Sequence, residues 1–122
     1  MRYNNLKRVK VSKPNGKNEK SYSIGMLYYS EKNYEKAIKY LKKAVKFREY
    51  YRTVFTLGKC YKKVGQLEKA ENAFNRVLKL DENNVYARLE LGKLCVERNE
   101  KKEAEKLFKE CLELKHDDIY SR

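Results

Sequence analysis

Apolar residues recur along the chain at helical spacing, in pairs of short segments separated by polar turns. From about Glu19, apolar positions at i, i+3, i+4 and i+7 predict a helix that ends at the turn 30–33, followed by a second helix. The same arrangement predicts two more helix pairs, with inner turns at 64–66 and 98–100. Short polar links join the pairs, most clearly at 80–84, where Asn or Asp can cap the next helix.

One pattern of small and large residues occurs three times along the chain. Its glycines are 33 and 34 residues apart, which is the period of stacked helix-pair repeats. Gly inside a helix costs about 1 kcal/mol relative to Ala, so we expect close helix approach to offset that cost, with Gly58 facing Ala70. The three copies are Ile24-Gly25, Tyr28, Ala37, Leu41 and Ala44; Leu57-Gly58, Tyr61, Ala70, Phe74 and Val77; and Leu91-Gly92, Cys95, Ala104, Phe108 and Cys111.

These copies resemble the repeats of the tetratricopeptide family and cover about five sixths of the chain. The predicted repeats span residues 18–50, 51–84 and 85–118. The fold class is therefore all-α, an α-solenoid of three antiparallel helix pairs in a right-handed superhelix. The chain departs from the family pattern at two sets of positions. Ser21, Val54 and Arg88 stand where the family favours Trp, and Glu49, Glu82 and His116 stand where it often has Pro.

Two segments lie outside the repeats. Residues 1–17 carry a Pro-Asn-Gly turn signal and no helical period, which predicts a basic, flexible arm. Residues 119–122 are interpreted as the start of a further helix or a truncated end, with Asp117-Asp118 as its cap. An apolar face would then be left uncovered on the last helix, so we expect a longer repeat protein or self-association. That face comprises Leu107, Phe108, Cys111 and Leu112.

The charge of the chain is strongly positive and uneven. Its 122 residues carry a formal net charge of +13, with +6 in residues 1–17 and −1 in residues 85–118. Such a basic end favours acidic partners: nucleic acid, anionic lipid or acidic peptide. No apolar run approaches the roughly 18–20 residues of a membrane span, so a cytoplasmic protein is predicted.

Catalytic chemistry is not predicted. The three cysteines, Cys60, Cys95 and Cys111, lie within the helical pattern without a C-x-x-C pair, which favours apolar packing over disulfide, zinc or nucleophile roles. The single histidine, His116, follows the last apolar residues and is interpreted as a favourable charge at a helix C-terminus. We therefore expect a protein that is not an enzyme and that has no cofactor or metal.

The surface is the remaining place for function. The family resemblance implies that first helices line a concave groove for a peptide or helix, and the stripe one residue beyond the packing positions supplies aromatic, apolar and basic side chains. The alternative is that this stripe packs neighbouring first helices together. The predicted groove residues are Tyr22, Met26, Tyr29, Arg52, Phe55, Lys59, Lys62, Lys63, Tyr86, Leu89, Lys93 and Val96.

Two narrower functions differ in how well the sequence fits them. Carboxylate-clamp members of the family need Lys and Asn where this chain has Tyr22 and Met26, and another Asn where it has Thr56, so binding of acidic chaperone tails is not expected. The competing hypothesis is nucleic-acid or other polyanion binding through the basic arm and the first repeat. Its candidate residues are Arg2, Lys7, Arg8, Lys10, Lys13, Lys17, Lys36, Lys39, Lys42, Lys43 and Lys46.

Overall fold

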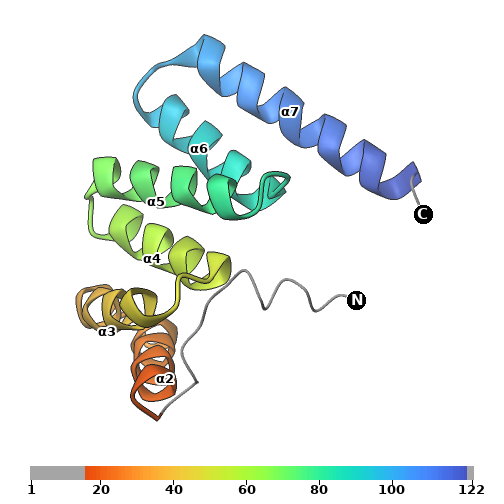
Figure 1. Ribbon diagram of the computed structural model, residues 1–122. Coiled ribbons are helices and arrows are strands. Elements are labelled where there is room, and N and C mark those ends of the chain that lie inside the picture. Colours follow the sequence, from red (N-terminus) through yellow and green to blue (C-terminus); the bar gives the residue numbers. More distant parts are fainter. Residues whose placement is uncertain (1–15, 121–122) are drawn as a thin grey trace.

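The protein is an all-α stack of helix pairs. The computed structural model describes the backbone of residues 16–120 and the side chains of residues 19–114, and within that range it contains helices and no strand. Successive helices lie one upon another in a curved column (Figure 1). The helices are α2 (Gly16–Ser30), α3 (Tyr34–Phe47), α4 (Tyr51–Lys63), α5 (Leu67–Leu80), α6 (Val85–Glu97) and α7 (Lys101–Tyr120). The predicted α-solenoid of three helix pairs is confirmed.

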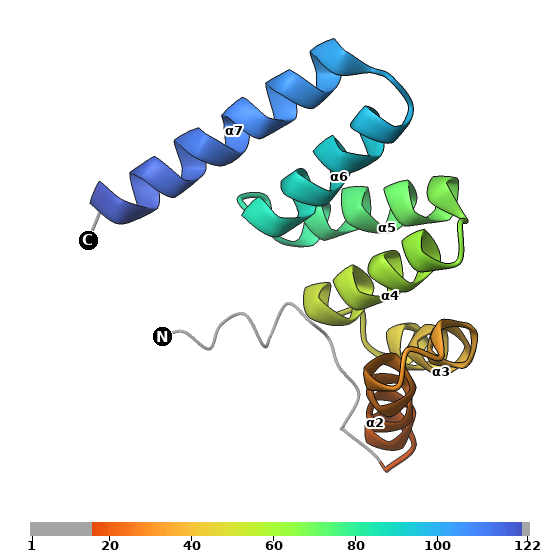
Figure 2. The ribbon, with the colours of Figure 1, turned by 180° about the vertical axis from the view of Figure 1, so that it is seen from behind.

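Each helix packs mainly on its neighbours in the chain. The pairs α2 and α3, α4 and α5, and α6 and α7 have the largest contacts, and α3 with α4 and α5 with α6 join one pair to the next. The view from behind shows the same sequential stacking (Figure 2). One cluster of buried apolar residues runs from Ala37 in α3 to Leu94 in α6, so the core is shared along the column rather than closed within one pair.

The predicted close approach at the repeated glycines is present in all three pairs. A Cβ placed on Gly25 would lie 2.7 Å from Leu41 Cδ2, and one on Gly58 would lie 2.8 Å from Phe74 Cε1. On Gly92 the added Cβ would collide with the ring of Phe108. The expected nearest neighbour of Gly58 is wrong: the atoms closest to its added Cβ belong to Phe74 and Ala73, and not to Ala70, which is also fully buried. A large side chain, rather than a second small one, thus fills the space each glycine leaves.

The turn inside each pair has the same backbone geometry. Lys32, Gly65 and Asn99 each have a positive φ, of 64°, 85° and 64°. The amide after each of them donates to a carbonyl five residues back, at 2.9 Å from Asn33 to Tyr28, 2.9 Å from Gln66 to Tyr61 and 2.8 Å from Glu100 to Cys95. This is the Schellman arrangement, which ends a helix abruptly and reverses the chain.

Asparagine side chains cap the N-termini of two of the helices. Asn33 Oδ1 accepts from the Lys36 amide at 3.3 Å, and Asn84 Oδ1 accepts from the Ala87 amide at 2.8 Å. Asn84 belongs to the polar link 80–84, so the predicted cap at that junction is confirmed. These bonds satisfy amides that the first helical turn leaves without partners.

The C-terminal end differs from the prediction. Helix α7 continues through Asp117 and Asp118 to Tyr120, so no new helix begins there and position 116 lies inside a helix. The expected uncovered apolar face is also largely absent, because Phe108 packs on Gly92 and Cys111 is buried with its thiol 3.6 Å from the Val85 carbonyl oxygen. Of that face, Leu112 is the strongly exposed residue, at 69%.

The N-terminal boundary shifts slightly. Helix α2 begins at Gly16, two positions before the first repeat was expected to start. Residues 1–15 of the predicted arm, and with them Arg2, Lys7, Arg8, Lys10 and Lys13, lie outside the described residues.

Candidate functional site

Neighbouring first helices are joined by a lysine lying over two aromatic rings. Lys59 of α4 places its Nζ 5.8 Å from the centre of the Tyr29 ring on α2 and 5.6 Å from the centre of the Phe55 ring. Three of the predicted groove residues therefore meet at one place. We call the surface formed by the twelve predicted residues on α2, α4 and α6 the first-helix face. At its centre it offers a cation held against aromatic rings.

Phe55 also belongs to the core. Its ring centre lies 5.5 Å from that of Phe74, the fully buried side chain that fills the Gly58 position. Phe55 itself is half-buried and packs on the main apolar cluster. This contact joins α4 to the second helix of its own pair, so it does not test the alternative that the stripe packs neighbouring first helices together.

An acidic residue that the sequence analysis missed links α4 to α6. Glu90 Oε1 lies 3.0 Å from Lys62 Nζ, and its Oε2 lies 3.8 Å from Lys93 Nζ. The Glu90 side chain is only 13% exposed. The signal available in the sequence was its i, i+3 spacing to Lys93 within the third first helix. Glu90 neutralises part of the positive charge on the first-helix face.

The remaining predicted residues differ in exposure. Tyr22, Tyr86 and Val96 are exposed, at 39%, 69% and 55%. Met26 and Leu89 are half-buried, whereas Arg52 and Lys63 are exposed. The Arg52 guanidinium lies 5.8 Å from the centre of the Tyr51 ring. Contacts with aromatic rings position Lys59 and Arg52, and the ion pair with Glu90 positions Lys62, so the α4 part of the face is held by its neighbours.

Ion pairs link neighbouring repeats of the scaffold that carries this face. Glu49 receives two hydrogen bonds from Arg76, both at 2.5 Å, and Arg98 donates to Glu71 at 2.9 Å. The hydrogen bond from Arg76 lowers the pKa of Glu49, against an opposing effect of burial. Each pair connects residues 27 positions apart, so it crosses from one repeat to the next.

The cysteines are buried free thiols, as the sequence analysis predicted. Burial raises the pKa of Cys60 to about 11, and burial is also the main cause that raises the pKa of Cys95 and Cys111. Such thiols are almost entirely protonated near neutral pH and have little nucleophilic character. Over the side chains that the structure describes, no group of three or more His, Cys, Asp or Glu residues is arranged to hold a metal ion.

The chain belongs to the tetratricopeptide repeat family. It matches that family over residues 19–83 and again over residues 64–121. Among curated proteins it is 31% identical over 97 residues to the human protein O-mannosyl-transferase TMTC2, across 76% of this chain and 12% of that protein. It is also 48% identical over 44 residues to the CTR9 homolog of Arabidopsis thaliana, across 36% of this chain and 4% of that protein. The chain thus spans a small fraction of these relatives.

Solved structures share the fold at low sequence identity. MamA superposes with a TM-score of 0.80 at 23% identity, covering 84% of this chain and 60% of that one. The Yersinia enterocolitica type III secretion chaperone SycD, in complex with a peptide of the translocator YopD, gives 0.77 at 22% identity, covering 83% and 78%. PcrH, in complex with the chaperone binding region of PopB, gives 0.75 at 19% identity, covering 85% of each chain.

None of the helices in residues 16–120 combines the length and the apolar character needed to cross a membrane.

Proposed function

We propose that the protein is an interaction scaffold whose first-helix face binds a peptide or helical segment of another protein. The observation that carries the proposal is the position of Lys59, which lies over Tyr29 and Phe55 between two neighbouring first helices. Family membership supports it, as do the fold neighbours SycD and PcrH, each of which holds a segment of another protein. The transferase name of the human relative belongs to a protein of which this chain matches 12%.

The chemistry of the face favours a segment with both apolar and acidic residues. Five of the twelve residues are Lys or Arg, and Glu90 neutralises only the part of that charge nearest Lys62 and Lys93. Tyr22 and Val96 supply exposed apolar area beside these cations. Aromatic rings and cations together provide anchors and orientation for a bound chain.

A selection from a random peptide library tests this function. Peptides selected on the native chain are then measured against Tyr22→Ala with Lys59→Glu, and against the control Lys79→Glu on the exposed side of α5. We expect the selected peptides to be acidic and apolar and to lose at least about tenfold in affinity for the first variant, with little change for the control. Equal affinity for both variants would remove the first-helix face as the binding site.

A polyanion is the second candidate, because tyrosines and lysines cluster on the first repeat. The Tyr28 and Tyr40 rings stack with centres 5.9 Å apart, and Lys36 Nζ lies 5.4 Å from the Tyr28 ring centre. Lys39 and Lys43 lie 5.6 Å and 5.2 Å from the Tyr40 ring centre. Titration of labelled oligonucleotide at two salt concentrations tests it, since binding to phosphates weakens steeply as salt rises.

A further inference from the structure

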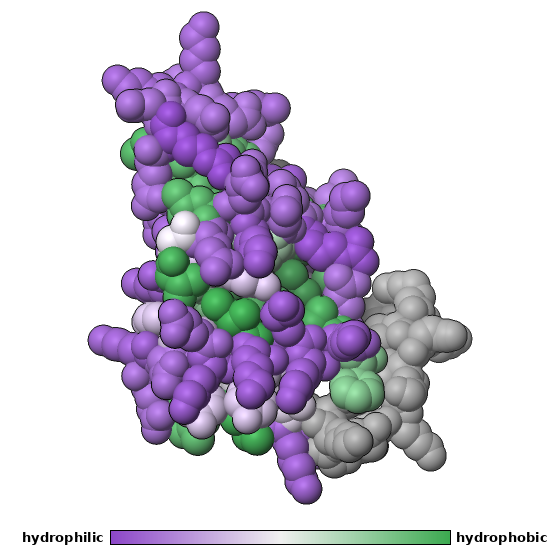
Figure 3. Space-filling model, turned by 90° about the vertical axis from the view of Figure 1, so that its left-hand side faces the viewer, coloured by the Kyte–Doolittle hydropathy of each residue, from purple (hydrophilic) through white to green (hydrophobic). Residues whose placement is uncertain are grey.

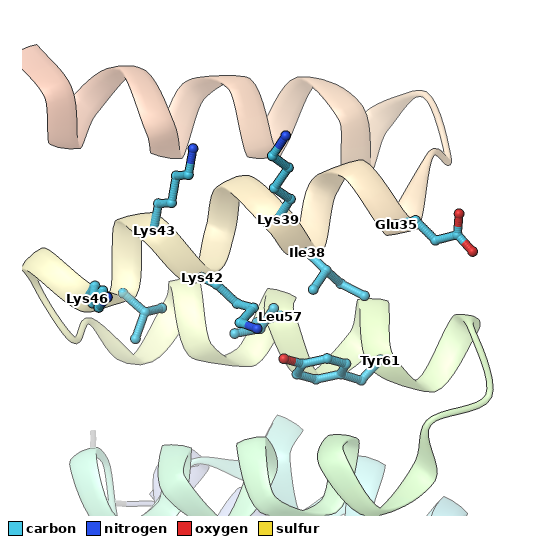
Figure 4. A pocket seen from close by; sticks show the side chains of 9 residues that line it. Glu35, Ile38, Lys39, Lys42, Lys43, Lys46, Leu57 and Tyr61 are labelled. Carbon is cyan, nitrogen blue, oxygen red and sulfur yellow. The ribbon is translucent and has the colours of Figure 1, made fainter.

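A groove lies between α3 and α4, apart from the first-helix face. Its volume is about 740 Å³, within the range of sites that hold organic ligands or side chains. Leu57 and Tyr61 of α4, 8% and 9% exposed, form its floor. Ile38 and Val45 of α3 are half-buried along its wall. The groove therefore has an apolar interior that is open to the surface (Figure 4).

The border of the groove is basic. Four lysines of α3 line it, together with a single acidic residue, Glu35. The lysines are Lys39, Lys42, Lys43 and Lys46, and all are exposed. Figure 4 shows Lys42 extending toward Leu57 and Tyr61, while Lys39 and Lys43 extend in the direction of α2. Lys42 therefore places its positive charge beside the apolar floor, whereas the charged ends of Lys39 and Lys43 lie over the Tyr40 ring and point toward α2.

A further lysine approaches from α5. Lys69 places its Nζ 5.7 Å from the centre of the Tyr61 ring.

Figure 3 shows a face of the molecule on which apolar surface is exposed between hydrophilic side chains, so the protein leaves apolar area uncovered on its outside. Apolar surface bordered by charge is typical of places where another chain docks.

The groove and the first-helix face lie on different sides of α4. The groove uses Leu57 and Tyr61, whereas the first-helix face uses Phe55 and Lys59. Residues two positions apart on a helix are turned by about 200° relative to each other. Substitutions at exposed positions of α3 can therefore change the groove without altering the first-helix face.

The chemical character of the side chains that line the groove distinguishes between possible occupants. Ile38, Val45 and Leu57 are aliphatic and offer no ring for a nucleic-acid base to stack on. Tyr61 is 9% exposed, and Lys69 lies over its ring. Aliphatic or aromatic side chains of a protein helix suit such a floor, with carboxylates beside them reaching the lysines.

We propose that the α3–α4 groove is a second docking site, which binds an amphipathic helix of another protein that has apolar residues on one face and acidic residues along both edges. The site is independent of the proposed function of the first-helix face. The chain would then hold two protein segments at once, one on each side of α4.

A defined peptide tests the proposal. The probe is a fluorescent synthetic helical peptide with leucines on one face and glutamates along both edges, titrated into the full chain while methyl resonances of Ile, Leu and Val are recorded. We expect saturable binding that shifts the methyl signals of Ile38, Val45 and Leu57. Absence of binding at millimolar peptide, or shifts confined to the neighbourhood of Leu89 and Val96, would overturn the proposal.

Charge-matched variants make the test specific. Lys42→Glu with Lys46→Glu reverses the charge of the groove border, and Lys102→Glu with Lys106→Glu makes the same change at exposed positions of α7. We expect the groove variant to lose at least about tenfold in affinity and the α7 variant at most about twofold. Equal losses would show that net charge alone attracts the peptide and would overturn the site.

Three further measurements separate the alternatives. Lys59→Glu should leave binding of this peptide within about twofold of the native chain, because it alters only the first-helix face. A single-stranded oligonucleotide that displaced the peptide and shifted the same methyl signals with equal affinity would overturn the assignment to a protein helix. A peptide with lysines in place of the glutamates should not bind.

Discussion

Phe74 Cε1 lies 2.8 Å from the point where a Cβ would stand on Gly58, so the ring of one helix occupies the space that glycine leaves in the other. The Ala73 Cβ lies 3.1 Å from the same point. Phe74 is fully buried and in contact with Phe55, which leaves it little room to move aside. The close packing of α4 against α5 therefore depends on the absence of a side chain at position 58.

Gly58→Ala should destabilise the protein despite the better helix propensity of alanine. Alanine gains about 1 kcal/mol in the helix, but overpacking of a rigid seam costs about 1–3 kcal/mol, so we expect a net loss of roughly 1 kcal/mol. Gly58→Leu should cost more than about 3 kcal/mol, because both outer pairs depend on the middle pair. Urea unfolding followed by circular dichroism measures both.

A double-mutant cycle tests the partner of Gly58. If Phe74 is the obstacle, Phe74→Leu should reduce the cost of Gly58→Ala, whereas Ala70→Gly should leave that cost unchanged. Coupling to Ala70 instead of Phe74 would contradict the contact between Gly58 and Phe74.

The three turns inside the pairs offer a matched comparison. Lys32 and Asn99 have a φ of 64° and Gly65 a φ of 85°, a conformation that costs a residue with a side chain about 1–2 kcal/mol. Lys32→Gly should therefore stabilise the protein by roughly 0.5 kcal/mol after the added entropy of unfolded glycine is subtracted, and Gly65→Ala should destabilise it by about 1 kcal/mol. Melting curves measure both, and shifts of the same sign would refute the assignment.

The pairing of helices and the inner turns could be predicted because both depend on local spacing. Apolar residues at i, i+3 and i+4 fix the buried side of each helix, and the turns lie where that spacing is interrupted. The partner of Gly58 could not be predicted in this way, since the angle at which two helices cross decides whether Ala70 or Phe74 meets it. Aspartate is tolerated inside a helix, so Asp117-Asp118 gave a false start signal in what is the last turn of α7.

The candidate site was only partly accessible from the sequence. The meeting of Tyr29, Phe55 and Lys59 follows from the first-helix stripe once first helices stack side by side. Glu90 was missed because its role depends on a residue 28 positions away, Lys62. The α3–α4 groove was missed because it is space that side chains leave unfilled, which no residue pattern specifies.

The Glu49–Arg76 pair should make stability depend on pH in the acid range. The hydrogen bond from Arg76 lowers the pKa of Glu49 from its ordinary value of 4.5 in the folded state. The stabilising contribution is therefore complete above that ordinary value and is lost as pH falls through the lowered folded value. Arg76→Gln should cost up to about 1 kcal/mol at neutral pH, because the pair is partly exposed.

Urea unfolding of the native chain and of Arg76→Gln at neutral pH and near pH 2 measures this effect. The difference between the two should disappear at the acid end. Lys79→Gln on the same helix removes an equal charge and serves as the control, with little change expected at either pH. A loss for Arg76→Gln that was the same at both pH values would rule out a contribution from the Glu49 carboxylate.

Substitutions at Phe55 and Lys59 should differ in their effect on stability. Phe55→Ala removes the ring contact with Phe74 from a half-buried position, so we expect a loss of about 2 kcal/mol in unfolding free energy. Lys59→Ser removes only the cation that lies over Tyr29 and Phe55, which should cost less than about 1 kcal/mol. Thermal melts compare them, and an equal loss would mean that Lys59 also holds neighbouring repeats together.

Cys60 should be nearly unreactive in the folded protein. Its side chain is fully buried and burial raises its pKa to about 11, so on the order of one thiol in ten thousand is ionised at pH 7. Labelling with a thiol-specific chromophore should therefore be slow in buffer for all three cysteines and complete within the mixing time in denaturant. Lys102→Cys at an exposed position of α7 provides the control, in which one added thiol reacts immediately. Rapid modification of Cys60 in the native chain would show that the seam between α4 and its neighbours opens far more readily than this packing allows.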